Sequence, residues 1–391
     1  MREEWEYKKL GEVCTIERGG SPRPITDYIT DSEDGINWIK IGDAQEGSKY
    51  ITSTKEKIRP EGIKKSRLVH KGDFILSNSM SFGRPYILKV DGCIHDGWLV
   101  IHDDNEVFIK DYLYYILSSH IMYAKFSQLA VGGVVNNLNS SLVRKVTIPF
   151  PPKSTQLSIV SELDKINELI RLKKEQLKDY DNLAQSIFYD MFGDPVENEK
   201  GWEVKKLGEV CSQITDGTHN SPTNTKNGDF KYVTAKNIKK EGIVLDNITY
   251  VDADTHHSIY SRCNPEYGDI LYIKDGATAG IATINNLNEE FSLLSSVALL
   301  KLEDKIINYY LKAVLNTPSL YNCIRTNMGG AAITRLTLVK IKAIKIPLPP
   351  LPLQHLFAQR IEHIEHQKSA VQKSITDLET LLASRMQYWF E

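Results

Sequence analysis

The sequence predicts an α+β protein in which two similar globules are joined by two long helices that pair as an intramolecular antiparallel coiled coil. The first observation is a repeated decapeptide, WEYKKLGEVC at 5–14 and WEVKKLGEVC at 202–211, with nine identities in ten. The second is a proline-rich pentapeptide near the end of each half, IPFPP at 148–152 and IPLPP at 346–350. The third is a long glycine-free segment after each pentapeptide. Such self-similarity indicates one structural plan used twice, a pseudo-twofold repeat.

Matching residues set the boundaries of the repeat. The offset is 197 at the decapeptides and at the paired glycines, Gly132-Gly133 and Gly329-Gly330, and it becomes 198 at the prolines. These glycines indicate a tight turn or a close backbone approach. We expect a first globule, a first helix, a second globule and a second helix at 1–152, 153–197, 198–350 and 351–391.

Each globule has the pattern of short strands separated by turns. β-branched and aromatic runs alternate with Gly, Pro, Asn and Asp. The clearest strand candidates lie at 38–41, 74–76, 86–90, 248–251 and 270–273. One late helix per globule is expected, at about 110–128 and 305–326. Between their repeated ends the halves differ in sequence, so we expect the same frame with different contents.

The long segments have the apolar spacing of a coiled coil. Alternating steps of four and three residues, from Ile159 to Met191 and from Phe357 to Trp389, fall mostly on apolar side chains. The predicted seam consists of Leu163, Ile166, Ile170, Leu177, Ile361, Ile364, Ile375 and Leu378. Such a stripe can be covered by the other helix, by a second copy of the chain or by the neighbouring globule. Pairing within the chain covers both stripes at once, and we predict it.

Composition and charge restrict the class of protein. The start, MREEWEYKKL, lacks the apolar stretch of a signal peptide, and no apolar run approaches the roughly 20 residues of a membrane span. We therefore expect a cytoplasmic protein with no membrane partner. Five cysteines without a CxxC pair argue against a disulfide framework and a zinc site. A net charge of -2 means that any DNA binding must depend on local basic patches.

We find no sequence pattern of an active site. The chain has no G-x-G-x-x-G, no G-x-x-x-x-G-K-[ST], no H-E-x-x-H and no G-x-S-x-G motif. His256 and His257 are adjacent, and side chains of adjacent residues in a strand point apart, so we expect them on the surface. The prediction is a non-enzymatic chain with no metal and no cofactor.

The order of these features resembles the specificity subunits of type I restriction–modification systems. The residues that carry the resemblance are W-x-x-K-K-L-G-E-V opening each half, I-P-x-P-P-x-x-x-Q closing it, and the long helix that follows. The resemblance covers essentially the whole chain. It implies that the globules are target-recognition domains, each reading one half of a bipartite, asymmetric site in double-stranded DNA. It also implies that the coiled coil is a spacer that docks two modification (methyltransferase) subunits, which restriction subunits then join.

Polar, glycine-bounded loops after matching strands are the first candidates for DNA contact, SNSMSFGRP at 77–85 and KDGATAG at 274–280. Arg84 can bind guanine and Asn78 adenine through paired hydrogen bonds, whereas lysines neutralise phosphates. The predicted DNA-contacting residues are Lys40, Ser77, Asn78, Ser79, Arg84, Lys236, Asn237, Lys274 and Thr278. Two alternatives stay open: these segments are ordinary surface loops, or the chain is a coiled-coil adaptor whose globules bind protein instead of DNA.

Overall fold

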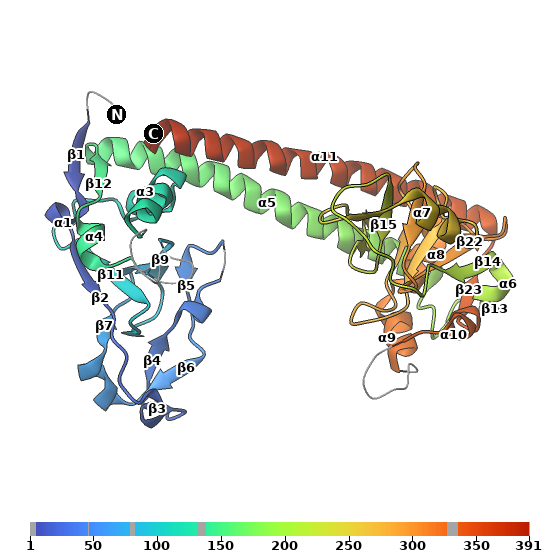
Figure 1. The fold of residues 1–391 in the computed structure, drawn as a ribbon, viewed down its shortest axis with the longest axis horizontal. Helices are drawn as coiled ribbons and strands as arrows, with labels where there is room; N and C mark the ends of the chain where they lie inside the picture. Colours follow the sequence, from blue (N-terminus) through green and yellow to red (C-terminus); the bar gives the residue numbers. More distant parts are fainter. Residues whose placement is uncertain (1–4, 46, 79–82, 131–137, 327–334, 391) are drawn as a thin grey trace. The chain divides into compact units, whose positions relative to one another are not determined.

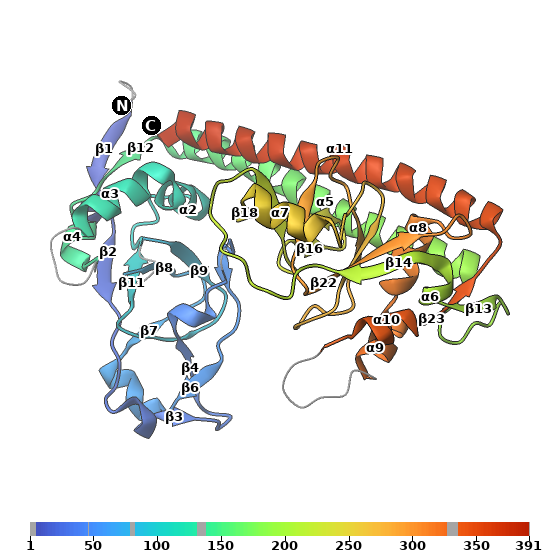
Figure 2. The same cartoon turned by 45° about the vertical axis from the view of Figure 1, so that its right-hand side comes forward.

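The structure is a computed structural model that describes residues 5–45, 47–78, 83–130, 138–326 and 335–390. The chain forms two compact units (Figures 1 and 2): unit 1 is Met1–Lys173 with Ser374–Glu391, and unit 2 is Lys174–Lys373. Each long helix contributes one part to each unit. The paired glycines and Ser79 lie outside the described residues.

Unit 1 combines short strands with helices. Its strands are β1 (Glu6–Lys9), β2 (Thr15–Arg18), β3 (Ile29–Thr30), β4 (Ile36–Ile39), β5 (Tyr50–Ile51), β6 (Glu56–Ile58), β7 (Arg67–Val69), β8 (Phe74–Ser77), β9 (Pro85–Leu88), β10 (Gly92–Ile94), β11 (Trp98–His102) and β12 (Thr147–Phe150). Its own helices are α1 (Leu10–Val13), α2 (Lys110–Ser118), α3 (His120–Ala130), α4 (Ser140–Arg144) and the 3-10 helices η1 (Ile25–Asp27), η2 (Ile41–Asp43) and η3 (Pro60–Lys65). The sheets have the orders β2-β11-β8-β9-β5, β3-β6-β4-β10-β7 and β1-β12.

Unit 2 repeats this plan with local changes. Its strands are β13 (Glu203–Lys206), β14 (Cys211–Asp216), β15 (Phe230–Val233), β16 (Ile238–Lys239), β17 (Gly242–Ile243), β18 (Thr249–Val251), β19 (Ile270–Ile273), β20 (Ala282–Ile284), β21 (Phe291–Leu293), β22 (Val297–Leu302) and β23 (Lys345–Leu348). Its own helices are α6 (Leu207–Val210), α7 (Ala253–Tyr260), α8 (Asn308–Leu315), α9 (Pro318–Thr326) and α10 (Leu338–Lys342). The sheets have the orders β14-β22-β19-β20, β18-β15-β21, β16-β17 and β13-β23.

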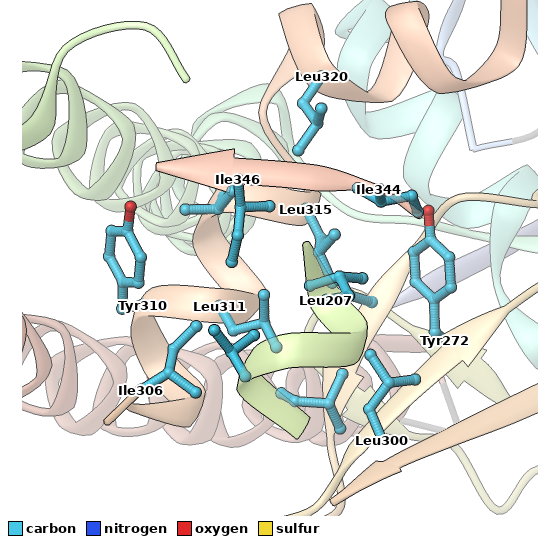
Figure 3. Close-up of a cluster of buried hydrophobic side chains, with 14 of the residues drawn as sticks. Leu207, Tyr272, Leu300, Ile306, Tyr310, Leu311, Leu315, Leu320, Ile344 and Ile346 are labelled. Atoms are coloured by element: carbon cyan, nitrogen blue, oxygen red, sulfur yellow. The ribbon is translucent and has the colours of Figure 1, made fainter. Parts of the chain in front are cut away.

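The repeated ends of the two halves make the same hydrogen bonds at the edge of the core in both units. In unit 1 the hydroxyl of buried Tyr112 donates to the carbonyl of Pro149 at 3.1 Å, and in unit 2 that of Tyr310 donates to Pro347 at 2.8 Å. Gln354 accepts from the N–H of Ile307 and donates to the carbonyl of Pro349, as its counterpart in unit 1 does. Figure 3 shows the apolar cluster of unit 2, in which side chains of α6, α8, β23 and the sheet meet. The I-P-x-P-P-x-x-x-Q motif therefore fixes the start of each long helix to its globule through these hydrogen bonds.

The long helices α5 (Lys153–Phe192) and α11 (Leu351–Phe390) run in opposite directions. In unit 1, Arg385 pairs with Glu162, and in unit 2, Lys368 pairs with Asp181 at 2.7 Å, further along α5 but earlier along α11. The seam residues named from the sequence are buried, apart from the half-buried Leu177 and Leu378. The fold class is therefore as predicted: two α+β units and an antiparallel helix pair.

The late helix of each globule is divided, contrary to the sequence expectation. Ser119 has an extended backbone between α2 and α3, and its hydroxyl donates to the carbonyl of Ile116 at 2.7 Å. In unit 2, Thr317 donates in the same way to Val314 at 2.8 Å, and Pro318 begins α9. A proline is tolerated in the first turn of a helix, where its missing N–H would have no partner in the helix. Pro318 therefore marks the start of a new helix in the sequence itself.

His256 is buried, not exposed as expected. It lies in a helix instead of a strand, because the side chain of Asp252 accepts from the N–H of Thr255 and caps α7. Its ring stacks on Phe230 with 3.8 Å between centroids, and Nδ1 lies 3.1 Å from the hydroxyl of Ser292.

Candidate nucleic-acid interface

Two residues named from the sequence, Asn78 and Lys274, occupy the same position in the two units. Each directly follows the corresponding central strand, β8 or β19. The N–H of Asn78 donates to Gly97 and its carbonyl accepts from Leu138. The N–H of Lys274 donates to Ser296 and its carbonyl accepts from Leu336, which lies 198 residues after Leu138. The backbone frame is therefore shared, and the side chain is what differs.

A glycine lets a neighbouring loop approach this position closely in both units. A Cβ on Gly19 would lie 2.1 Å from the carbonyl oxygen of His95, and one on Gly217 would lie 1.9 Å from that of Leu293. Both distances are far below van der Waals contact, so any side chain there would force the loops apart. The segments that follow β2 and β14 are thus held against the loops that precede β11 and β22.

In unit 1 the loops meet around Asp96. Its backbone carbonyl accepts from the side-chain amide of Asn78 at 2.9 Å and from Nε of Arg18 at 3.0 Å. Its carboxylate accepts from the hydroxyl of Ser21 at 2.8 Å and lies 3.7 Å from Arg23. Burial raises the pKa of Asp96, but the Ser21 hydrogen bond and the nearby cations outweigh burial and hold it below its usual value. Asp96 is therefore a charged anchor around which two arginines are placed.

A hollow of about 750 Å³ adjoins this anchor, lined in part by Arg23, Lys40, Trp38 and His95. The ring of His95 accepts from the N–H of Ile41 at 3.1 Å. Burial lowers the pKa of His95 below its usual value, so the ring is neutral at physiological pH. The hollow therefore combines cationic side chains with a neutral aromatic wall.

In unit 2 the corresponding loops meet around Asp216. This buried carboxylate lies 3.1 Å from the ammonium of Lys274, which is also buried, and 3.2 Å from Nε2 of His219. The guanidinium of Arg262 donates to the backbone carbonyls of Asp216 and Gly217. The carboxylate is inside, while the side chains of His219 and Arg262 are each 52% exposed. A buried anion thus lies beneath two half-exposed side chains, the imidazole of His219 and the guanidinium of Arg262.

The remaining sequence candidates divide by exposure. Arg84, Lys236 and Thr278 are exposed, and Lys40 is half-buried and paired with Glu56. Those with buried side chains, Ser77, Asn78, Asn237 and Lys274, each contact the loop backbone or a neighbouring carboxylate. Asn237, for example, accepts from the N–H of Thr234 and donates to Val244.

The buried members of the set therefore shape the loops instead of presenting groups to a ligand. Sequence reasoning missed residues that belong to the same clusters, namely Arg18, Arg23, Asp96, Asp216, Arg262 and Arg335. They come from segments far apart in the chain, so no local motif marks them. The glycines after β2 and β14, in ERGG and TDGT, are the one sequence signal that could have drawn attention to these loops.

Among the described residues, no group of three or more His, Cys, Asp and Glu side chains is placed to hold a metal ion. No helix in the described ranges combines the length and the apolar character needed to cross a membrane.

The chain matches the family model described as type I restriction modification DNA specificity domain twice, at residues 2–179 and 199–380. The type I restriction enzyme MjaIX specificity subunit of Methanocaldococcus jannaschii is 23% identical over 97% of this chain and 90% of the relative. The putative MjaX specificity subunit of the same organism is 22% identical over 93% of this chain and 87% of its own length. A solved structure, from work on complex assembly and conformational transition of the type I R-M system, covers 99% of this chain and 97% of its own, with a TM-score of 0.65 and 20% identity. This structural similarity concerns the fold alone.

Proposed function

The chain belongs to the type I restriction modification DNA specificity family, and on this premise we propose that it reads an asymmetric, bipartite DNA site, one half with each unit. The observation that carries the proposal is the matched pair of loop clusters around Asp96 and Asp216. Each cluster exposes cations from a rigid backbone frame, and such cations neutralise phosphates and read base edges. The side chains differ between the units, so the two half-sites should differ as well.

The contacts of the proposed interface come from the exposed members of each cluster. In unit 1 these are Arg18 and Arg23, with the predicted Lys40 and Arg84 nearby on other loops. In unit 2 they are His219, Arg262 and Arg335, with Lys236 and Thr278 as further candidates. A local cluster of this kind explains how a chain of net charge -2 can bind DNA at all.

We further propose that α5 and α11 dock two modification subunits, which restriction subunits then join, and that the chain performs no chemistry itself. The outer faces of these helices support a docking role. Large apolar side chains are exposed there, including Leu157, Leu169, Leu172 and Leu183 on α5 and Leu356 and Leu381 on α11. A partner subunit that docks on these helices would cover these leucines.

The experiment that tests the function is a map of DNA adenine methylation in cells with and without the gene. Loss of one bipartite motif on deletion, restored by the wild-type gene, is the expected result. The motif itself gives both half-sites and the spacer between them. An unchanged map in cells that contain the cognate modification subunits would contradict the proposal and favour a protein-binding adaptor.

A further inference from the structure

We propose that Arg335, positioned by Asp275, is the side chain with which unit 2 reads a guanine; this inference rests on the DNA-reading function proposed above. The side chain of Arg335 is 53% exposed, and its Nε lies 3.3 Å from Oδ1 of Asp275. No described residue contacts its terminal nitrogens Nη1 and Nη2 through a hydrogen bond or ion pair. One edge of the guanidinium is thus engaged by the protein, and the other is available to a ligand.

The backbone also fixes Arg335 to the loop that carries Asp275. The two residues form an antiparallel bridge, and the N–H of the next residue, Leu336, donates to the carbonyl of Lys274 at 2.8 Å. Leu336 is buried in the core cluster of unit 2. Arg335 is therefore anchored on both the main-chain and the side-chain level, which reduces the entropy lost when it binds a base.

Asp275 is itself held by charge. The buried ammonium of Lys274 lies 3.8 Å from Oδ2 of Asp275 and 3.1 Å from Asp216. The Oδ1 atom of Asp275 is buried and has no hydrogen bond of good geometry within the described structure. A buried carboxylate oxygen is costly unless its charge is compensated, and Nε of Arg335, 3.3 Å away, supplies an opposite charge to this oxygen.

The exposed edge of the guanidinium has the chemistry to read guanine. Two parallel N–H donors match the O6 and N7 acceptors of guanine in the major groove, and adenine, which offers a donor in place of O6, does not fit. A phosphate could accept from the same donors, but it would give no discrimination between bases. The carboxylate of Asp275 holds the Nε edge of the guanidinium, which favours a directional contact of the other edge with a base.

The test uses the chain assembled with its modification subunits and a duplex that contains the methylated motif. Each guanine of the motif is replaced in turn by 7-deazaguanine, which lacks the N7 acceptor. For one guanine we expect the replacement to weaken binding to the wild type by about 5- to 150-fold, the range of a bidentate base contact. Binding by R335A should be weaker from the start and should be insensitive to that replacement alone.

Two further variants separate positioning from charge. D275N removes the carboxylate that holds Nε, so we expect a reduced response to the same 7-deazaguanine with a smaller loss of overall affinity. K340A removes an exposed cation of the nearby helix α10 and should leave the response at every guanine unchanged. Hydrogen exchange in β19 checks that each variant retains the fold of unit 2.

Two results would overturn the inference while the function stands. One is R335A retaining the wild-type response at every guanine. The other is R335A weakening binding to all sequences equally with a smaller salt dependence, which identifies a phosphate contact. Failure of the wild-type complex to bind the motif at all would overturn the proposed function itself, and the inference with it.

Discussion

Asn78 in unit 1 and Lys274 in unit 2 hold the same backbone position with different chemistry. Asn78 donates one neutral hydrogen bond to the carbonyl of Asp96, and its Oδ1 has no hydrogen bond among the described residues. Lys274 is a buried cation between Asp216 and Asp275. The main-chain hydrogen bonds are the same in both cases, so the loop keeps its place whichever side chain is present. The difference teaches that the backbone holds the position of the loop and leaves the chemistry of the anchoring side chain free to vary.

A second matched pair lies at the other end of the same strands. In unit 1, Asp73 is 3.7 Å from His102, and in unit 2, Asp269 accepts from Lys301 at 2.9 Å. Each carboxylate also accepts from a backbone N–H three residues before it. One unit therefore uses a cation that titrates near neutral pH, and the other uses a permanent one. The same pairing of strands therefore accommodates either a histidine or a lysine beside the aspartate.

Asp216→Leu should give the largest effect, confined to unit 2. It leaves the ammonium of Lys274 buried, with only Asp275 as a carboxylate partner at 3.8 Å. Removing one member of a buried pair costs about 3–5 kcal/mol. Hydrogen exchange measured by mass spectrometry should show faster exchange in β14 and β19 and no change in unit 1. The double variant Asp216→Leu, Lys274→Met should recover most of the loss, and a single variant as stable as the wild type would contradict the role of the pair.

Ile166→Ala and Ile364→Ala should destabilise the two units by similar amounts, because the two residues hold equivalent positions in the helix seam. Both are buried in the helix seam, in unit 1 and unit 2 respectively, and they lie 198 residues apart. Truncating a buried isoleucine should cost about 3 kcal/mol in each case. Urea unfolding of the full chain, together with hydrogen exchange in α5 and α11, measures the two losses. A large loss in one unit and none in the other would mean that the seam is not equivalent in the two halves.

Asn78→Ala should be milder than the change at Asp216. It removes the hydrogen bond to the carbonyl of Asp96, and Oδ1 of Asn78 has no hydrogen bond among the described residues. The expected loss is about 1 kcal/mol in the free energy of local opening, measured by hydrogen exchange in β8 and β11. A loss as large as that of Asp216→Leu would break the comparison between a neutral and an ionic loop anchor.

His102→Gln should give the smallest effect, visible as a pH dependence. The interaction with the carboxylate of Asp73, 3.7 Å away, raises the pKa of His102, so its contribution is complete below about pH 6.5 and is lost as pH rises through the folded pKa. Burial raises the pKa of Asp73, but its bonds from His102 and His70 outweigh burial and lower it, so its contribution is lost only in acid. The stability difference between wild type and variant should be less than about 1 kcal/mol. Thermal unfolding should show it in full at pH 5.5 and show it shrinking as pH rises through the folded pKa.

Lys301→Gln is the control for this pH dependence. Burial lowers the pKa of Lys301, but its bonds to Glu266 and Asp269 outweigh burial and raise it. The lysine therefore stays charged from pH 5.5 to 8, and the effect of its variant on Tm should not follow the titration of a histidine. A parallel pH dependence in both variants would show that the effect does not come from His102.

The framework could be predicted from the sequence because its signals are local and repeated. The decapeptides, the prolines with Gln156 and Gln354, and the 3.5-residue stripes each occur twice, and helices of this length follow from periodicity alone. The breaks at Ser119 and Thr317 and the helix that buries His256 were missed, because a capping side chain competes with periodicity at these points.

The candidate site was only partly predictable. The loops at 77–85 and 274–280 were identified correctly as equivalent, but exposure could not be read from residue type. Polar residues such as Asn78 and Lys274 were expected to face DNA, but the side chains of both are buried in the structure. Their partners Asp96 and Asp216 lie 18 and 58 residues away in the chain, a distance over which no sequence pattern indicates contact.

The sequence by itself determined that this protein has one plan used twice, an α+β unit with a long apolar-striped helix, because periodicity and repetition are properties of neighbouring residues. Only the tertiary structure decided which polar side chains became buried anchors and which became the exposed cations of the proposed DNA interface. That choice depends on which loops meet after the strands have paired, and on whether a buried charge finds a partner there.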